Sequence, residues 1–191
     1  MSTEQSKAQD VMTAASILRP TGADSARAGG VYSVECHDAA GNLKWSDTFH
    51  NLVVNQGLQD MNSKYFSGSG YTAAWFLGLV QGPGSGTTFA AADTLASHAG
   101  WTENTNYTGN RKAVTFGTAT TADPSVITNS AAPSVFTMNA NAQTIAGAFL
   151  CSVNSGTSGI LFSAGDFTGG DKIVDSGDTL SVTYQFSLDA A

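Results

Sequence analysis

Histidines and glycine-rich turns are the first places in this sequence to look for chemistry. The three histidines are His37, His50 and His98, and none belongs to an H-E-x-x-H motif or to a closely spaced pair that would predict zinc. A G-x-S-x-G nucleophile turn is absent. The glycine-rich run at residues 82–86 contains Pro83 and lacks the Lys-Ser/Thr ending of a phosphate-binding loop. We therefore predict no catalytic, cofactor-binding or metal-binding residue, and no enzymatic activity.

Carboxylates gather near the C-terminus, at Asp166, Asp171, Asp175 and Asp178. Calcium takes several oxygen ligands, which such loops can supply. However, the D-x-[DN]-x-[DN]-G register of a calcium loop is missing, and aspartate beside glycine is typical of turns. We favour turns here and keep calcium as the alternative.

Sugar chemistry would need paired carboxylates or exposed aromatic rings. The glutamates are Glu4, Glu35 and Glu103, and a glycosidase-like carboxylate pair can come together only in the fold. Trp45 and Trp75 occupy core-like positions in strand patterns, whereas Trp101 lies in a loop-like stretch. Trp101 is therefore the one candidate for stacking against a sugar.

Cys36 and Cys151 lie far apart, both in strand-like stretches. We predict reduced core cysteines rather than a disulfide. The N-terminal residues MSTEQSKAQD lack the cationic and apolar regions of a signal peptide, so we expect a protein that stays in the cytosol where it is made.

Charge is scarce in this chain of 191 residues, at 12% of the sequence against the usual quarter. The net charge of -7 argues against duplex DNA or RNA as a partner, because phosphate binding needs clustered Lys and Arg. A mean hydropathy of -0.05, without a long apolar run, argues against a membrane span. Hydrophobic residues still make up 41% of the chain, enough to build a core.

Residues 1–29 differ from the rest of the chain. They hold little aromatic content and one short helix-compatible piece at residues 11–18, followed by Pro20, Gly22 and Gly29. This composition predicts an extended N-terminal arm, with a disordered tail as the alternative. Residues 30–191 are then expected to form one β-sandwich domain.

The pattern from residue 30 onward is mainly β. The expected strands are residues 31–36, 43–49, 71–80, 112–119, 134–140, 144–153, 160–163 and 179–188. Strict alternation makes the last of these the clearest, with Leu180, Val182 and Tyr184 on its buried face. Many short strands separated by Gly- and Pro-containing turns predict antiparallel sheets in a β-sandwich or jelly roll.

Two details of this prediction concern faces and helices. In a hairpin of residues 31–36 and 43–49, Leu43, Trp45 and Phe49 are expected to face the core. A helix is predicted over residues 55–66, capped by Asn55 and closed by Gly68, with Leu58, Met61 and Tyr65 as its apolar stripe. A second, short helix is predicted at residues 93–98, capped by Asp93.

Several short runs resemble a group of structural proteins from the virions of tailed bacteriophages. These runs are residues 32–36, 41–45, 49–53, 64–66, 71–75, 96–101 and 176–180, within a similarity that covers about residues 30 to 188. The resemblance implies a β-rich shell component, such as a capsid cement (decoration) protein or an adaptor between the tail and its fibres. It carries over no active-site residue.

Three functions are therefore expected in turn. The first is a capsid cement protein that binds the lattice of the major capsid protein and self-associates as a dimer or trimer, matching local capsid symmetry. The second is a tail or fibre adaptor that joins the tail or portal to fibre proteins. The third is a carbohydrate-binding virion module. All three place the protein in the virion, on the capsid exterior or the tail, assembled in the host cytoplasm, with neither nucleic acid nor membrane as a partner.

Overall fold

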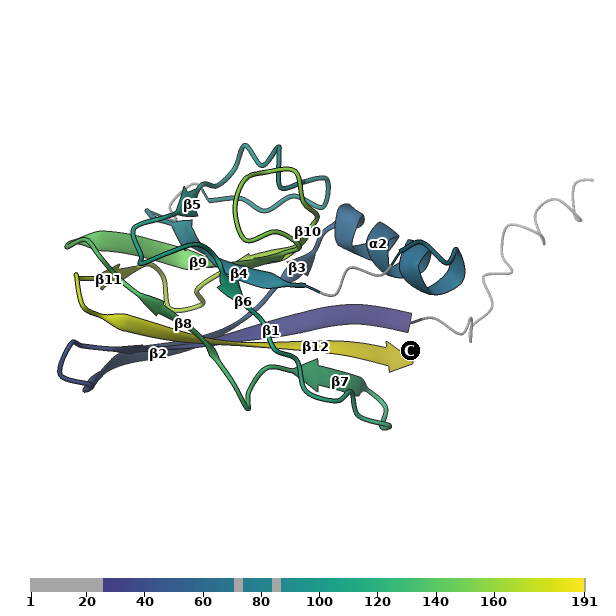
Figure 1. Cartoon of the computed structure of the whole chain (residues 1–191), viewed down its shortest axis with the longest axis horizontal. Helices are drawn as coiled ribbons and strands as arrows, with labels where there is room; N and C mark the ends of the chain where they lie inside the picture. The colour runs from purple at the N-terminus through teal and green to yellow at the C-terminus, as the bar shows by residue number, and fades with distance from the viewer. Residues whose placement is uncertain (1–25, 71–73, 84–86, 191) are drawn as a thin grey trace, which may run out of the picture.

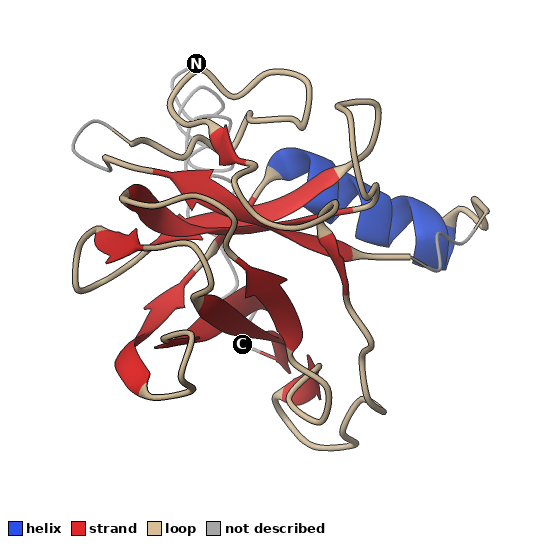
Figure 2. Ribbon diagram, turned by 60° about the vertical axis from the view of Figure 1, so that its left-hand side comes forward, coloured by secondary structure: helices blue, strands red, loops and turns tan. Residues whose placement is uncertain are grey.

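A computed structural model describes residues 26–70, 74–83 and 87–190 of the chain. These residues form two facing antiparallel sheets and one helix (Figures 1 and 2). The fold is therefore mainly β with a sandwich arrangement, as the alternating pattern predicts. The described helix is too short and too polar to cross a membrane.

The first sheet is built around two long neighbouring strands, β1 (Ala26–His37) and β12 (Thr179–Ala190). They pair antiparallel along their whole length, from Ala26 opposite Ala190 to His37 opposite Thr179. β2 (Leu43–His50) pairs with the outer side of β1. β7 (Ser125–Thr128) and β8 (Ser134–Thr137) pair with the other side of β12, one after the other along its length.

The second sheet is built around β4 (Phe76–Gln81), β9 (Gln143–Cys151) and β10 (Leu161–Asp166). Short strands complete it: β3 (Leu52–Val53), β5 (Glu103–Asn104), β6 (Lys112–Ala113) and β11 (Lys172–Val174). α2 (Asn55–Phe66) follows β3 and lies at one end of the sandwich (Figure 1).

The main core lies between the two sheets. Tyr32, Val34 and Cys36 of β1 are fully buried there and belong to one cluster with Leu77 and Leu79 of β4. A second cluster covers the opposite face of the second sheet and includes Phe149 of β9 and Trp101. Because apolar groups cover both faces, β4 and β9 are apolar on both sides rather than alternating.

Strand boundaries differ from the sequence prediction at the N-terminal arm. β1 begins at Ala26, so residues 26–29, which were assigned to the arm, belong to the sheet. Their low aromatic content hid this pairing, because Ala28 and Gly29 rely on backbone hydrogen bonds to β12. The remainder of the predicted arm, residues 1–25, lies outside the described residues, as do residues 71–73 of the strand predicted at 71–80.

The helix prediction is correct in its bounds and wrong in two details. The N-cap is Val54 and no side chain caps the helix, so the predicted Asn55 cap is wrong. Gly68 does take the left-handed conformation (φ 65°) just past the end of the helix, as predicted. Of the predicted apolar stripe, Met61 packs against the core while Leu58 and Tyr65 are exposed.

Three further predictions are corrected. Residues 93–98 form a tight turn with a bridge between Thr94 and Ser97, not a helix. Leu43 is 57% exposed, because a bulge between Cys36 and His37 shifts the end of the hairpin out of register. Residues 112–119 pair only at Lys112–Ala113, and β7, at Ser125–Thr128, was not predicted.

Candidate functional site

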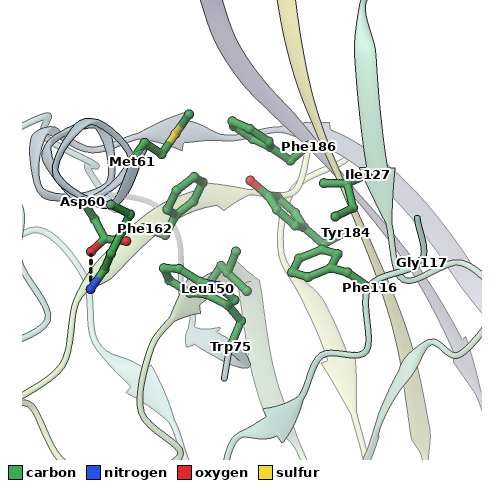
Figure 3. Close-up of a pocket in the computed structure, with 11 residues that line it drawn as sticks. Asp60, Met61, Trp75, Phe116, Gly117, Ile127, Leu150, Phe162, Tyr184 and Phe186 are labelled. Carbon is green, nitrogen blue, oxygen red and sulfur yellow. Dashed lines mark ion pairs between the residues drawn. The ribbon is translucent and has the colours of Figure 1, made fainter. Parts of the chain in front are cut away.

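An apolar pocket of about 410 Å³ lies between α2 and the two sheets. Figure 3 shows its side chains converging from separate parts of the chain. Met61 comes from α2, Leu150 and Phe162 from the second sheet, and Tyr184 and Phe186 from β12. Trp75, just before β4, closes one side, and its ring meets that of Phe162 edge-on, with centroids 5.3 Å apart.

Unequal strand lengths explain why this pocket exists. β1 and β12 each have 12 residues, whereas β4 has 6 and β9 has 9. At about 3.3 Å per residue the longer pair extends beyond the second sheet by roughly 10–20 Å. α2 lies opposite part of this overhang (Figure 1). A helix cannot match the shape of the missing strands, and the space between is left open.

α2 is held in place by close contact with β10. Gly57, in the first turn, is buried, and a Cβ atom there would lie 2.5 Å from the carbonyl oxygen of Phe162. The Gln56 side-chain oxygen accepts a hydrogen bond from the Leu161 N–H at 2.8 Å. The Val54 N–H donates to the Phe162 carbonyl at 3.1 Å. The glycine therefore sets the distance between helix and sheet, and with it the shape of the pocket.

Polar groups near the pocket are already engaged. The Asn51 amide donates to the Tyr184 hydroxyl at 3.0 Å, and the hydroxyls of Tyr32 and Ser163 lie 2.9 Å apart. Burial raises the pKa of both Tyr32 and Tyr184, so both phenols stay neutral hydrogen-bonding groups.

The charged groups among the described lining residues are Asp60 and Lys64, which pair with each other at 3.7 Å (Figure 3). The pocket thus has the chemistry to hold an apolar group. Its described lining offers no nucleophile activated by a neighbouring base.

Trp101, the predicted sugar-stacking residue, is 5% exposed. Its indole N–H donates to Asp93 at 3.1 Å, and its ring packs against Phe149 of β9 at 5.1 Å. The interpretation of Trp101 as an exposed platform is wrong. A loop-like sequence around it concealed a long-range contact with the second sheet.

The three histidines lie apart. His37 and His50 are at opposite ends of the β1–β2 hairpin, where His50 is opposite Val31 and His37 is opposite Leu43. The His98 ring stacks on Trp101 at 3.9 Å, and its Nδ1 lies 2.9 Å from the Trp101 carbonyl oxygen. His98 therefore belongs to the packing of this turn.

The aspartates near the C-terminus are used in local structure. Asp178 is buried and accepts hydrogen bonds from the Asp175 N–H at 2.8 Å and from Lys44 Nζ at 2.5 Å. Asp175 in turn accepts one from the Ala142 N–H at 2.9 Å. This agrees with the turn interpretation for Asp175 and Asp178, whereas Asp166 is exposed at the end of β10 and Asp171 lies just before β11.

Within residues 26–70, 74–83 and 87–190, no three His, Cys, Asp or Glu side chains come close enough together to hold a metal ion. Calcium, kept as the alternative for these aspartates, gains no ligand set from the described residues.

A buried ion pair was not predicted from the sequence. Arg111, 7% exposed, donates to both oxygens of Glu103, from Nε at 2.8 Å and from Nη2 at 2.7 Å. Its Nη1 donates to the carbonyl oxygens of Val153 at 3.2 Å and Gly156 at 3.0 Å. Every donor direction serves the protein itself, so the pair holds β5 against the loop after β9 and plays a structural part.

Cys36 and Cys151 are both buried and form no disulfide, as predicted. Burial, with a contribution from the nearby charge of Asp178, raises the pKa of the Cys36 thiol to about 11. Burial also raises the pKa of Cys151. Neither thiol is prepared for nucleophilic attack, because the reactive thiolate is disfavoured.

Comparison with known proteins finds no matching family model, no similar curated protein and no similar solved structure. The proposal for function therefore rests on the residues and surfaces described above and on the resemblance of the short sequence runs.

Proposed function

We propose that this chain is a non-enzymatic structural protein of a tailed-bacteriophage virion, and specifically a capsid cement protein. In this role it binds the lattice of the major capsid protein and stabilises it, with self-association as a dimer or trimer at local symmetry axes. The proposal takes the phage context from the resemblance of residues 30 to 188. It takes the assembly role from the surface of the molecule.

The exposed aromatic pair at the end of α2 is the observation that carries the assembly role. Tyr65 is 84% exposed and Phe66 is 78% exposed, and their rings meet edge-on with centroids 4.9 Å apart. Adjacent aromatic side chains are costly to leave in water and are enriched in the central contacts of protein interfaces. A partner that covers this pair would offset that cost, and the capsid lattice is the partner we propose.

The outer face of the first sheet supports assembly in a second way. Ser33 and Thr183 are opposite each other there, and the hydroxyls of Ser33 and Thr48 lie 3.2 Å apart. Hydroxyl groups of this kind cost less to remove from water than charges do. The low charge content, 12% of the chain, thus favours packing against neighbouring subunits.

The direct test is binding of the purified protein to expanded capsids that lack it. We expect the double variant Tyr65→Ser, Phe66→Ser to fold normally and to bind more weakly by at least about tenfold, because interface aromatics often contribute 2 kcal/mol or more. Leu43→Ser is the matched control, since it also removes an exposed apolar side chain but lies at the β2 hairpin. Equal binding of the double variant and the control would argue against the aromatic pair as the contact.

Copy number separates the cement role from the tail adaptor role. A cement protein is present in proportion to the capsid lattice, whereas an adaptor matches the symmetry of the tail. Quantitative mass spectrometry of virions, or the position of this chain in an image reconstruction, measures the difference directly. A location confined to the tail would replace the cement proposal with the adaptor.

A further inference from the structure

The pocket beside α2 lies close to the point where the N-terminal segment joins the sandwich. Phe186, in the pocket lining, is opposite Gly30 in the sheet, and Ala26 begins β1 four positions further along the same strand. At about 3.3 Å per residue, Ala26 is roughly 13 Å from the level of Phe186. Figure 1 shows this end of β1 on the same side of the molecule as α2. Residues 1–25 are thus attached next to the pocket.

The N-terminal 25 residues contain one run with large aliphatic side chains, at residues 11–18, with the sequence V-M-T-A-A-S-I-L. Residues 19–25 separate this run from β1 and reach up to about 24 Å when extended. That reach exceeds the distance from Ala26 back to Phe186, so the run can enter the pocket of its own chain. A short tether of this kind provides an effective concentration in the millimolar range.

The chemistry of the pocket favours an aliphatic segment over a charged small molecule. Aromatic and aliphatic side chains dominate its lining, and Lys64, its described cation, pairs with Asp60 and donates to the Gly70 carbonyl. Lys64 is therefore already occupied and gives an anionic head group little to bind. Leu58 is exposed beside Met61 on the same side of the helix and extends the apolar surface outward.

We propose that residues 11–18 occupy this pocket in cis, with Met12, Ile17 and Leu18 supplying the side chains that fill it. The segment buries Met61 and Phe186 from solvent and fixes α2 against the overhanging end of β1 and β12. This inference is independent of the proposed function, because it concerns the isolated chain and holds with or without a capsid partner.

Methionine-methyl NMR of the full chain tests this directly. The sequence contains Met1, Met12, Met61 and Met138, which place one label in the segment, one in the pocket and one in the core. We expect nuclear Overhauser contacts from the Met12 methyl to aromatic protons of the pocket. Deletion of residues 1–25 is expected to shift the Met61 methyl resonance while Met138, the internal reference for folding, stays in place.

Point variants of the full chain make the test independent of the deletion. Leu18→Asp is expected to move the Met61 resonance to its position in the deletion variant. Ser16→Asp, which adds the same charge to a polar position of the same segment, is expected to leave it unchanged. Identical Met61 spectra for the full chain and the Leu18→Asp variant would overturn the proposal.

Two further outcomes would also overturn it. If the Met12 contacts appear only as the protein is concentrated and dimers form, the segment binds in trans rather than in its own chain. If native mass spectrometry finds a co-purified apolar ligand that occupies the pocket in place of the segment, the occupant is a small molecule. Contacts that persist on dilution of a ligand-free monomer are the expected result.

Discussion

Gly57→Ala tests how the pocket is shaped, because sequence and structure predict opposite signs for its effect on stability. Glycine within a helix is a poor choice, and alanine there normally stabilises by about 1 kcal/mol. In this protein, however, the added Cβ would lie 2.5 Å from the carbonyl oxygen of Phe162 and 3.1 Å from its Cα. Both atoms belong to the backbone of β10, so they cannot rotate away, and α2 has to move.

The cost of that movement follows from the contacts it breaks. The helix must withdraw by roughly 1 Å to restore ordinary contact, which stretches the Val54–Phe162 and Gln56–Leu161 hydrogen bonds, now 3.1 and 2.8 Å long. Each contributes about 1 kcal/mol, and overpacking adds at least about 1 kcal/mol more. A loss of about 3 kcal/mol against a gain of about 1 kcal/mol leaves the variant less stable by about 2 kcal/mol.

Urea denaturation followed by circular dichroism measures this difference, and thermal unfolding should show a midpoint lower by about 4–8 °C. Asn62→Ala is the matched control, because Asn62 is exposed on the same helix and alanine there is expected to stabilise by about 0.5 kcal/mol. The reasoning is refuted if Gly57→Ala raises the free energy of unfolding as the control does.

Three other measurements check separate parts of the structure. Arg111→Met is expected to lower the free energy of unfolding by about 3 kcal/mol in urea denaturation, since it leaves the Glu103 carboxylate unpaired, whereas Lys112→Met should cost less than about 1 kcal/mol; equal losses would contradict a structural ion pair. The raised pKa of Cys36 means that the unfolded state loses its proton first, so stability should fall as pH rises from about 9 to 11, and Cys36→Ala should flatten that slope in pH-dependent denaturation. Deletion of residues 1–25 should preserve all of β1, whereas deletion of residues 1–29 removes its pairing with the end of β12 and should lower the melting temperature further; a scan showing the same midpoint for both would be inconsistent with the register.

Local patterns were sufficient to predict the elements whose environment is uniform along their length. β12 alternates strictly because one face meets the core and the other meets solvent, and its predicted inward side chains Leu180, Val182 and Tyr184 are fully buried. The helix bounds at Asn55 and Phe66 were likewise correct, since a glycine that takes positive φ follows the helix and a buried strand precedes it. In both cases neighbouring residues carry the information.

The candidate site was beyond reach of the same reasoning. Trp101 appeared to be in a loop because its contacts with Asp93 and Phe149 come from a turn and from a strand distant in sequence. Arg111 and Glu103 appeared as ordinary surface charges, since nothing in the local sequence marks the carbonyl groups of the loop after β9 as their partners. Turn sequences were read for their own geometry, whereas burial depends on what packs over them.

By itself, the sequence determined a charge-poor chain of β-strands with a helix at residues 55–66, reduced core cysteines and the absence of recognisable catalytic motifs. The tertiary structure decided where the arm ends, which tryptophan is buried and where a pocket opens. The physical reason is that alternation and capping act between residues a few positions apart, whereas the pocket arises from unequal lengths of strands that meet only in the folded state. Tyr184 and Met61 line one cavity because β12 outruns the second sheet and Gly57 sets the helix beside it.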